Sequence, residues 1–434
     1  MPRTSRLGLL RDRDFARLFA ATALGQLGDR VMFLAFPLVA IAALRADEFQ
    51  VGLLTATTTA GSLLVGLPAG AWVDRMRKRS VMISTDLARA LALLTVPVAW
   101  WAGLLTMEWL YAVALFHGVL TVFFDVAYVS CLPLLVGRDH LLEGNSKLSA
   151  IRSVTSISGP GVAGPLVGCV GAPATLLVSS AGMALSGLLA VGIREREPKP
   201  EQEQEPEPEP RERPRLVRDV KEGLGFVREQ PALRAILLGD ALFNLFLIMY
   251  QTMLLVFLER DAGLAPFGIG LVLSGMGGGA LLGALLATRL STWIGQGRVI
   301  WLAPLFTCPL TVLMPLTQPG WNVAVAALGL SALSLGGVVR VVAQSSFQQA
   351  LTPDRLLGRV SATARFVSWG GIPLGGLLGG AAGSAFGAAG TLWIGAAGMT
   401  LSVLPTVLSP LRTMRTWPAG LTPSSRAHSP ARSD

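Results

Sequence analysis

Charge is scarce in this chain of 434 residues. Only 15% of the residues are charged and 52% are hydrophobic, whereas soluble globular proteins carry roughly 25% charged residues. The few charges are clustered, so that long apolar stretches separate them, and the mean hydropathy is +0.56. This composition excludes a soluble globular protein, and we expect lipid to surround most of the chain.

Cysteine and histidine are equally scarce, with three of each. No histidine pair has zinc-ligand spacing. Cys131, Cys169 and Cys308 all lie in apolar segments, where we interpret them as small buried hydrophobic residues. The sequence lacks a phosphate-binding Gly-x-x-x-x-Gly-Lys-[Ser/Thr] loop, which disfavours an ATP-driven pump. It therefore predicts no enzyme, no catalytic residues, no cofactor and no metal site.

Apolar runs long enough to cross a bilayer are what the sequence has in abundance. Six precede an acidic, proline-rich segment and six follow it, so we predict an all-α integral membrane protein with twelve transmembrane helices. The runs cover residues 15–44, 50–73, 80–105, 109–136, 148–170, 173–193, 232–258, 266–288, 298–317, 321–350, 359–386 and 388–411.

The net charge is +9, and the positions of the basic residues along the chain indicate the membrane topology. The basic residues form no single face or stripe, which disfavours nucleic-acid binding. They recur in alternate short loops, while the opposite loops hold only Arg45 and Arg260. The positive-inside rule then places both termini in the cytoplasm. The excess of arginine over lysine is typical of a GC-rich bacterial genome, so we predict the inner membrane of a bacterium.

An internal repeat divides the chain at its centre. Ser149-Ala150-Ile151-Arg152 precedes Pro160 as Ala362-Thr363-Ala364-Arg365 precedes Pro373. Pseudo-symmetric six-helix halves are a known transporter architecture. The segment between the halves cannot bury apolar area, and we expect a solvated linker that ends in a short surface helix. The predicted units are a helix bundle at 1–193, the linker at 194–230, a second bundle at 231–411 and a cytoplasmic tail at 412–434.

Several motifs resemble those of the major facilitator superfamily. Residues 70–79, Gly-Ala-Trp-Val-Asp-Arg-Met-Arg-Lys-Arg, are similar to its Gly-x-x-x-Asp-Arg-x-Gly loop, with Arg77 in place of the last glycine. Residues 159–164 are similar to the Gly-Pro-x-x-Gly-Gly motif of its antiporters, with one residue out of register. Residues 123–133 and 348–362 resemble the enterobactin-exporter and macrolide-efflux branch. The resemblance implies the major facilitator fold, with export as the direction of transport.

The resemblance and the repeat also indicate gating or conformational residues. By resemblance, Asp125 would pair with the basic loop that follows the second run. Proton antiporters of this superfamily often carry an arginine in the fourth span, and Ala114 occupies that position here. Any proton must therefore be handled by other residues. The candidates for gating are Gly70, Asp74, Arg75, Arg79, Asp125, Arg152, Gly159, Pro160, Gly164, Arg365 and Pro373.

Ionisable side chains inside the apolar runs are candidates for transport, because each costs at least roughly 2.5–3.5 kcal/mol to insert. Asp29 is interpreted as a proton or cation site near the midplane, or as one member of a structural ion pair. His117 is either a proton carrier or an ordinary buried neutral histidine. Asp86 and Arg89 are interpreted as a local structural pair. The full set of proton or substrate candidates is Asp29, Arg30, His117, Asp240, Asn244, Gln251, Arg340 and Gln344.

Together these features predict a monomeric secondary-active transporter. We expect proton-coupled export of a small amphipathic organic compound, such as a siderophore, a macrolide-like natural product or a drug, by alternating access. The predicted partners are that small molecule, protons and membrane lipids. Uptake or lipid flipping by the same fold, and a membrane protein that binds or scaffolds without transport, remain the alternatives.

Overall fold

A computed structural model describes residues 8–137, 140–193, 224–317, 323–352 and 354–414. These residues form helices joined by short turns, and no strand occurs among them. The first group of helices is α1 (Arg13–Leu38) with the π-helix η2 (Val39–Ala43), α2 (Glu48–Asp74), α3 (Lys78–Trp101), α4 (Met107–Val136), α5 (Leu141–Val170) and α6 (Ala172–Val191).

The second group begins at Pro231. It consists of α8 (Pro231–Val256) with the π-helix η4 (Phe257–Asp261), α9 (Pro266–Ile294), α10 (Gln296–Thr307) with the 3-10 helix η5 (Cys308–Leu313), α11 (Val323–Leu351), α12 (Asp354–Leu401) and α13 (Leu404–Val407). We call α1–α6 the N-terminal half and α8–α13 the C-terminal half. The predicted linker and tail lie almost wholly outside the described residues, so the predicted unit boundaries stay predictions.

Local sequence explains where several helices begin and end. Asp47 accepts a hydrogen bond from the Gln50 backbone N–H while the Gln50 side chain accepts one from the Asp47 N–H, which closes a capping box before α2. Gly137 and Gly171 end α4 and α5 with φ of 70° and 84°, a backbone conformation that glycine adopts without steric cost. Gly387, at φ 73°, divides α12 into two segments that run in different directions.

Nine helical stretches in the described residues are long and apolar enough to span a membrane. The stretch of α5 is missing from these nine; it carries Glu143, Lys147 and Arg152. The stretch of α10 is missing too, because its α-helix ends after 12 residues and continues as η5. The all-helical membrane fold is confirmed, and the count of twelve spans stays a prediction.

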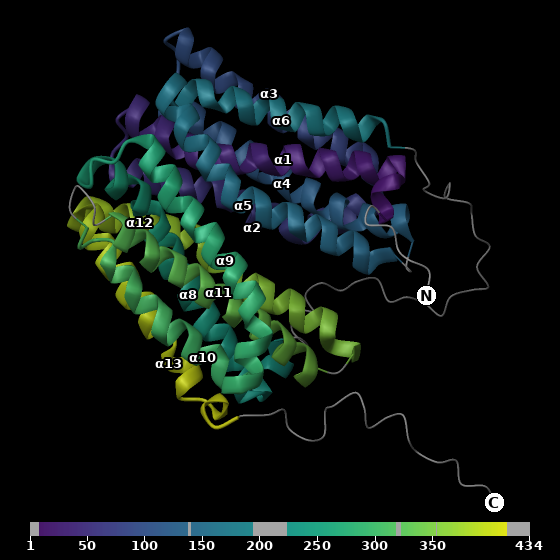
Figure 1. Cartoon of the computed structure of the whole chain (residues 1–434), viewed down its shortest axis with the longest axis vertical. Helices are drawn as coiled ribbons and strands as arrows, with labels where there is room; N and C mark the ends of the chain where they lie inside the picture. Colours follow the sequence, from purple (N-terminus) through teal and green to yellow (C-terminus); the bar gives the residue numbers. More distant parts are fainter. Residues whose placement is uncertain (1–7, 138–139, 194–223, 318–322, 353, 415–434) are drawn as a thin grey trace, which may run out of the picture.

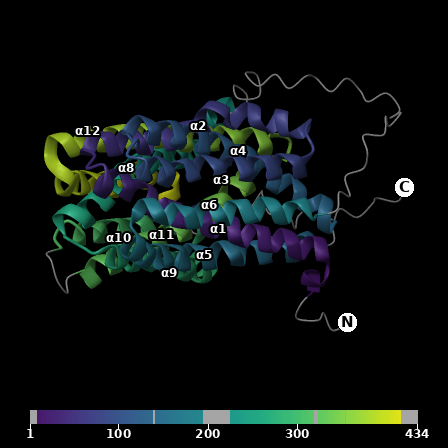
Figure 2. The same cartoon turned by 90° about the horizontal axis from the view of Figure 1, so that it is seen from above.

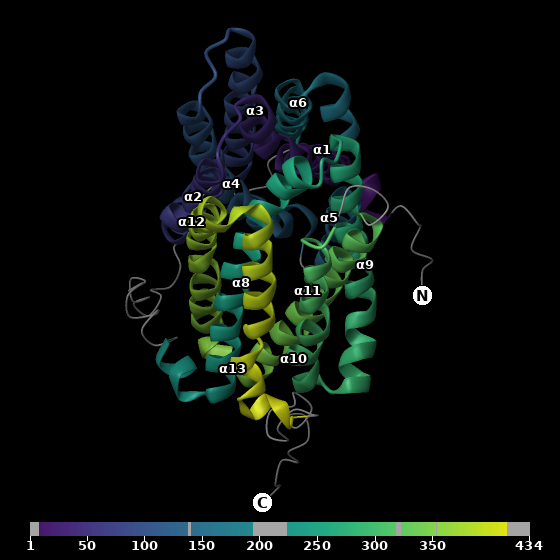
Figure 3. The same cartoon turned by 90° about the vertical axis from the view of Figure 1, so that its left-hand side faces the viewer.

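The two halves meet at one end and diverge toward the other. In Figure 1 the N-terminal half (purple to blue) and the C-terminal half (green to yellow) touch where α1 ends and separate toward its beginning. The main contacts between the halves join α2 to α12 and α5 to α9, as Figure 3 shows from the side. Within the N-terminal half, α1 packs between α6 and α5 (Figure 2). We name the closed end, which holds residues 44–47 and 261–265, the Asp47 end.

Glycines allow the halves to approach closely near the Asp47 end. A Cβ on Gly52 of α2 would lie 2.4 Å from Gly380 Cα of α12. A Cβ on Gly270 of α9 would lie 2.4 Å from the Pro160 carbonyl oxygen of α5, and one on Gly164 would lie 2.6 Å from the Pro266 carbonyl oxygen. Pro160, Gly161 and Gly164 of the sequence motif at 159–164 therefore form part of the contact between the halves.

Replacement of Gly270 by alanine is expected to destabilise this contact. The added methyl group must push α5 and α9 apart, an overpacking effect of roughly 1–3 kcal/mol. The matched control is Gly278→Ala on the same helix, where a Cβ meets no atom within 4 Å. Thermal unfolding in detergent measures both, and equal melting temperatures for the two variants would contradict the close approach.

Candidate functional site

A buried cluster of charged side chains joins three helices of the N-terminal half. α1 contributes Asp29, α3 contributes Arg89, and α4 contributes His117. Asp29 Oδ1 lies 3.7 Å from Arg89 Nη1 and 3.8 Å from His117 Nε2. The cluster therefore collects two of the predicted proton candidates, Asp29 and His117, around an arginine that the sequence analysis had assigned only to a local pair.

Arg89 is held rigidly from several sides. Its side chain is 1% exposed and forms an ion pair with Asp86, which is also 1% exposed. Asp86 in turn accepts a 2.6 Å hydrogen bond from Ser186 Oγ of α6. The guanidinium also donates to Thr121 Oγ1 at 3.3 Å and lies 4.5 Å from the centre of the Phe124 ring. The predicted local pair of Asp86 and Arg89 therefore exists, and it also points Arg89 at Asp29.

Two carboxyl groups of this cluster face one buried arginine. When both are ionised, Asp29 and Asp86 carry two negative charges against the single positive charge of Arg89, and neutral His117 adds none. Arg30 and Asp125 lie near enough to act on Asp29 as well, with opposite signs. Asp29 is the open member, because its side chain is 35% exposed while those of Asp86 and Arg89 are closed off.

The side of α1 that carries Arg30 faces away from α6. Gly25 and Gly28 pack closely on Ser186 and Ser179 of α6. Arg30 follows Gly28 by two residues and so lies on the opposite side of the helix, where it is exposed. On that side Arg30 packs against α5, because a Cβ on Gly159 would lie 2.3 Å from Arg30 Cβ.

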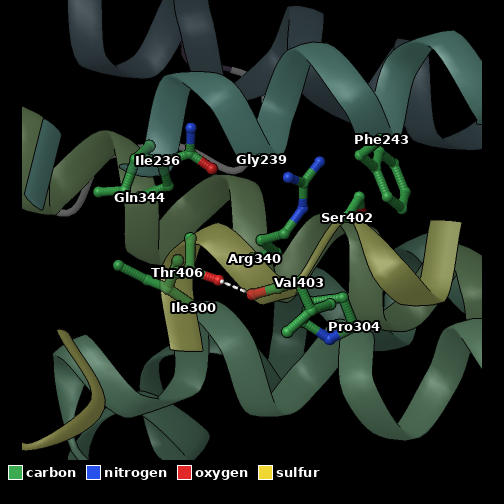
Figure 4. A pocket seen from close by; sticks show the side chains of 10 residues that line it. All are labelled: Ile236, Gly239, Phe243, Ile300, Pro304, Arg340, Gln344, Ser402, Val403 and Thr406. Atoms are coloured by element: carbon green, nitrogen blue, oxygen red, sulfur yellow. Dashed lines mark hydrogen bonds between the residues drawn. The ribbon is translucent and has the colours of Figure 1, made fainter. Parts of the chain in front are cut away.

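The C-terminal half contains a second polar cluster, between α8 and α11. Arg340 forms an ion pair with Asp240, whose other carboxylate oxygen accepts a hydrogen bond from the Gln344 amide. The guanidinium lies 4.1 Å from the centre of the Phe243 ring. A small cavity beside this cluster, drawn in Figure 4, is lined by Ile236, Gly239, Phe243, Arg340, Gln344 and Thr406 among others.

The two clusters differ in charge. Asp240 has one arginine and one amide, so its negative charge is matched, and the three side chains form an interhelical network. In the N-terminal cluster Asp29 and Asp86 share one arginine, and Asp29 is the more exposed of the two carboxyl groups.

Comparison with known proteins identifies the fold and the family. The model of a family described as "Transmembrane secretion effector" matches residues 4–432. The chain belongs to the major facilitator superfamily of transporters. It is 25% identical over 374 residues to the multidrug efflux pump Tap of Mycolicibacterium fortuitum, covering 84% of this chain and 87% of Tap.

Two further similarities agree with this assignment. The transporter is 26% identical over 305 residues to macrolide efflux protein A of Enterococcus faecalis, covering 68% of this chain and 89% of that protein. Its fold matches the crystal structure of a bacterial homologue of the iron transporter ferroportin in an inward-facing state, with a TM-score of 0.72, 14% identity, and coverage of 92% and 99% of the two chains. The predicted superfamily and the predicted efflux branch are confirmed.

The remaining candidates of this transporter are spread over several helices. Asn244 and Gln251 of α8 are half-buried, and Asp125 and Arg152 are exposed. Arg79 donates to the carbonyl oxygens of Ala190 and Val191, so it caps the end of α6. Arg75 is exposed, and a Cβ on Gly70 would meet no atom within 4 Å. Pro373 lies inside α12. The side chains of Asp74 and Arg365 are not among those described.

One sequence interpretation needs correction. Cys169 of α5 is exposed, whereas Cys131 and Cys308 are buried as predicted. An apolar side chain in a membrane helix has no need of protein burial, because lipid provides an apolar surrounding. Gly159 gains a further role as well, since a Cβ there would lie 2.3 Å from Arg30 Cβ and would displace that side chain.

Removal of the charge of Asp240 is expected to destabilise the transporter. Asp240→Asn leaves Arg340 without a matching negative charge in a largely buried place, and breaking a buried pair costs about 3–5 kcal/mol. Asn244→Ala, one helical turn further along α8, is the matched control and should cost less. Thermal unfolding of both purified variants checks this, and similar melting temperatures would show that the ion pair contributes little.

Proposed function

We propose that this transporter exports small amphipathic organic compounds from the cytoplasm in exchange for protons. The observation that carries the proposal is the N-terminal cluster, whose two carboxylates face one arginine and whose Asp29 side chain is 35% exposed. Buried ionisable groups inside membrane helices mark ion or substrate pathways because they are too costly to retain without a use.

In the proposed cycle Asp29 loads and releases the proton. When the space between the halves is open to the outside, a proton neutralises the cluster. When the same space is open to the cytoplasm, the proton leaves and the cluster regains its negative charge. Arg89 and Asp86 stay fixed by Ser186 and Thr121 throughout. The change in charge therefore occurs at Asp29 and alters its interaction with the neighbouring His117. Arg30, Asp125 and Arg152 are the further charges of the N-terminal half near this space.

The substrate class follows from the relatives and from the surface of α1. One relative is named a multidrug efflux pump and another a macrolide efflux protein. On the α1 side that carries Arg30, Phe33 is 55% exposed, so the exposed surface combines an aromatic ring with charged groups. Such a surface suits an organic molecule with both apolar and polar parts. Asn244 and Gln251 of α8 are the proposed polar contacts from the other half.

We further propose that the protein is a monomer in the inner membrane of a bacterium, with both termini in the cytoplasm. The Asp47 end then faces the outside, and the contacts between the halves close it there. This arrangement follows from the alternation of basic loops, and it makes the described conformation open toward the cytoplasm.

Reporter tags test this orientation. Tags at Gly8, within residues 200–210 and after Ala427 are expected to report the cytoplasm, and a tag beside Asp47 the outside, because the basic loops stay on the inner face. Accessibility to a membrane-impermeant reagent in intact cells gives the measurement. An external signal from the 200–210 tag would contradict the orientation.

Export itself is tested in inverted membrane vesicles. Vesicles that contain the protein should accumulate a macrolide or a cationic dye when an inward-acidic proton gradient is imposed, and an uncoupler should abolish the accumulation. Loss of dye from the vesicles under the same gradient would instead indicate uptake as the natural direction. Binding without accumulation would favour the scaffold alternative.

A further inference from the structure

Arg260 of the C-terminal half reaches across to the N-terminal half at the Asp47 end. Its Nη1 lies 3.3 Å from Glu48 Oε1 at the start of α2. Its Nη2 donates to the Ala46 carbonyl oxygen at 2.6 Å and to the Ile41 carbonyl oxygen at 3.4 Å. One side chain therefore binds the last turn of the α1–η2 helix, the following turn and the first residue of α2.

The two carbonyl groups need such a partner. A helix leaves its last carbonyl oxygens without intrahelical donors, and this end carries a partial negative charge. Ile41 lies inside η2, and Ala46 lies in the turn that follows it. Arg260 thus provides a C-terminal cap from the opposite half, with an arginine fork that suits several acceptors at once. The cap exists only while the halves are together at this end.

The same backbone turn ends the first helix of each half. Leu44 N–H donates to the Val39 carbonyl and Ala46 N–H to the Ala40 carbonyl. The matching bonds in the C-terminal half run from Ala262 to Phe257 and from Leu264 to Leu258. The residue between the two donors has a positive φ in both halves: 53° at Arg45 and 61° at Gly263.

When the two turns are aligned residue by residue, their side chains differ at the position of Arg260. The position in the N-terminal half that matches Arg260 is Ala42, whose methyl side chain reaches no carbonyl group. Arg45, the nearby arginine, instead occupies the position of Gly263. The two turns share a backbone, and only the C-terminal one carries an arginine that binds the other half.

We propose that Arg260 is a latch that holds the Asp47 end closed and must release before that end opens during transport. It is a positioning residue for alternating access, since it contacts neither the charge cluster around Asp29 nor the side of α1 that carries Arg30. This inference goes beyond the proposed function and requires only that the Asp47 end opens and closes, whatever the substrate or coupling ion.

Opening of the Asp47 end can be measured with one cysteine introduced at a buried position. Ser274 lies eight residues into α9, about 12 Å from its start, and its Oγ is buried beside Gly161 of α5. Ser274→Cys is placed in a variant whose native cysteines, Cys131, Cys169 and Cys308, are replaced by serine or alanine. A membrane-impermeant maleimide is applied from the Asp47 side, and the labelling rate is measured with no substrate present.

The labelling rate of the introduced cysteine is expected to rise about tenfold in Arg260→Gln. This corresponds to a shift of about 1.4 kcal/mol in the equilibrium between the closed and the open Asp47 end. Arg260→Lys should fall between the parent and Arg260→Gln, because an ammonium cannot fork to three acceptors. Arg45→Gly is the matched control: it removes an arginine from the same hollow of about 470 Å³ and should leave the rate unchanged.

Equal labelling rates in Arg260→Gln and Arg45→Gly would overturn the latch. If Arg260→Gln does not accumulate in the membrane, Glu48→Gln replaces it, since this variant loses the ion pair and keeps both carbonyl bonds. A rate about threefold above the parent is expected for Glu48→Gln, and an unchanged rate would also overturn the proposal. Neither result depends on export, so a failure of the proposed function is recognised separately.

Discussion

Asp29→Asn is expected to abolish efflux driven by a proton gradient while the protein still folds and binds substrate. Asparagine has nearly the shape of the protonated carboxyl group, so it keeps the cluster neutral and Arg89 in place. The cluster can then no longer gain or lose charge, and the gradient has nothing to act on. Dye accumulation in inverted vesicles should drop to the level of vesicles without the protein.

The control for this variant removes a carboxylate elsewhere. Glu108 lies in the first turn of α4 and is exposed, so Glu108→Gln changes the net charge equally without touching the cluster. It should retain efflux. Normal gradient-driven efflux in Asp29→Asn would remove Asp29 from the coupling role. Failure of Asp29→Asn to accumulate in the membrane would instead identify it as a structural partner of Arg89.

The second large effect is expected at Arg89. Arg89→Met should destabilise the protein by about 3–5 kcal/mol, because it leaves the buried carboxylate of Asp86 without its matching charge. The hydrogen bond from Ser186 remains but cannot replace a full positive charge. Thermal unfolding of the purified variant should show a large loss of stability, with little protein in the membrane.

A double variant separates this charge effect from a simple loss of packing. Arg89→Met combined with Asp86→Asn removes both charges and should recover part of the lost stability, since the two residues are coupled. A double-mutant cycle over the four proteins measures the coupling. Additive losses at the two positions would show that the ion pair does not carry the stability of this region.

The helices were predictable from the sequence because lipid imposes a simple rule. A helix satisfies its backbone within itself, so each apolar run of sufficient length is a helix. In the structure, local signals set several boundaries, such as the Asp47 cap before α2 and Gly171 between α5 and α6. α5 begins at Leu141, seven residues before the apolar run at 148–170, because its first two turns also hold polar residues such as Glu143 and Lys147.

The partners of the buried charges were not predictable in the same way. Arg89 stands three residues after Asp86, so its spacing pointed to a local pair, and the pair is real. That Arg89 also approaches Asp29 depends on how α3 and α1 both pack against α6, which no spacing along the chain encodes. The pairing of Asp240 with Arg340 is a contact of the same kind. In both cases the cost of an uncompensated charge in lipid was the only sequence signal.

Repeat matching located one symmetric feature and missed another. The motif that includes Arg152 and Pro160 was recognised by its side chains. The paired turns after α1 and α8 share backbone geometry but differ at nearly every residue, as Arg45 and Gly263 illustrate. Symmetry of this kind becomes visible only in hydrogen bonds and φ angles, and it is what reveals Arg260 as an addition specific to one half.

The most direct test of proton-coupled export uses the purified protein in liposomes. An internal pH dye and a fluorescent macrolide are followed together after a pH gradient is imposed across the membrane. The account predicts that protons and substrate move in opposite directions through the wild-type protein, and that both fluxes stop in Asp29→Asn. Substrate movement in the wild-type protein that is unaffected by the pH gradient, or that carries protons in the same direction, would contradict it.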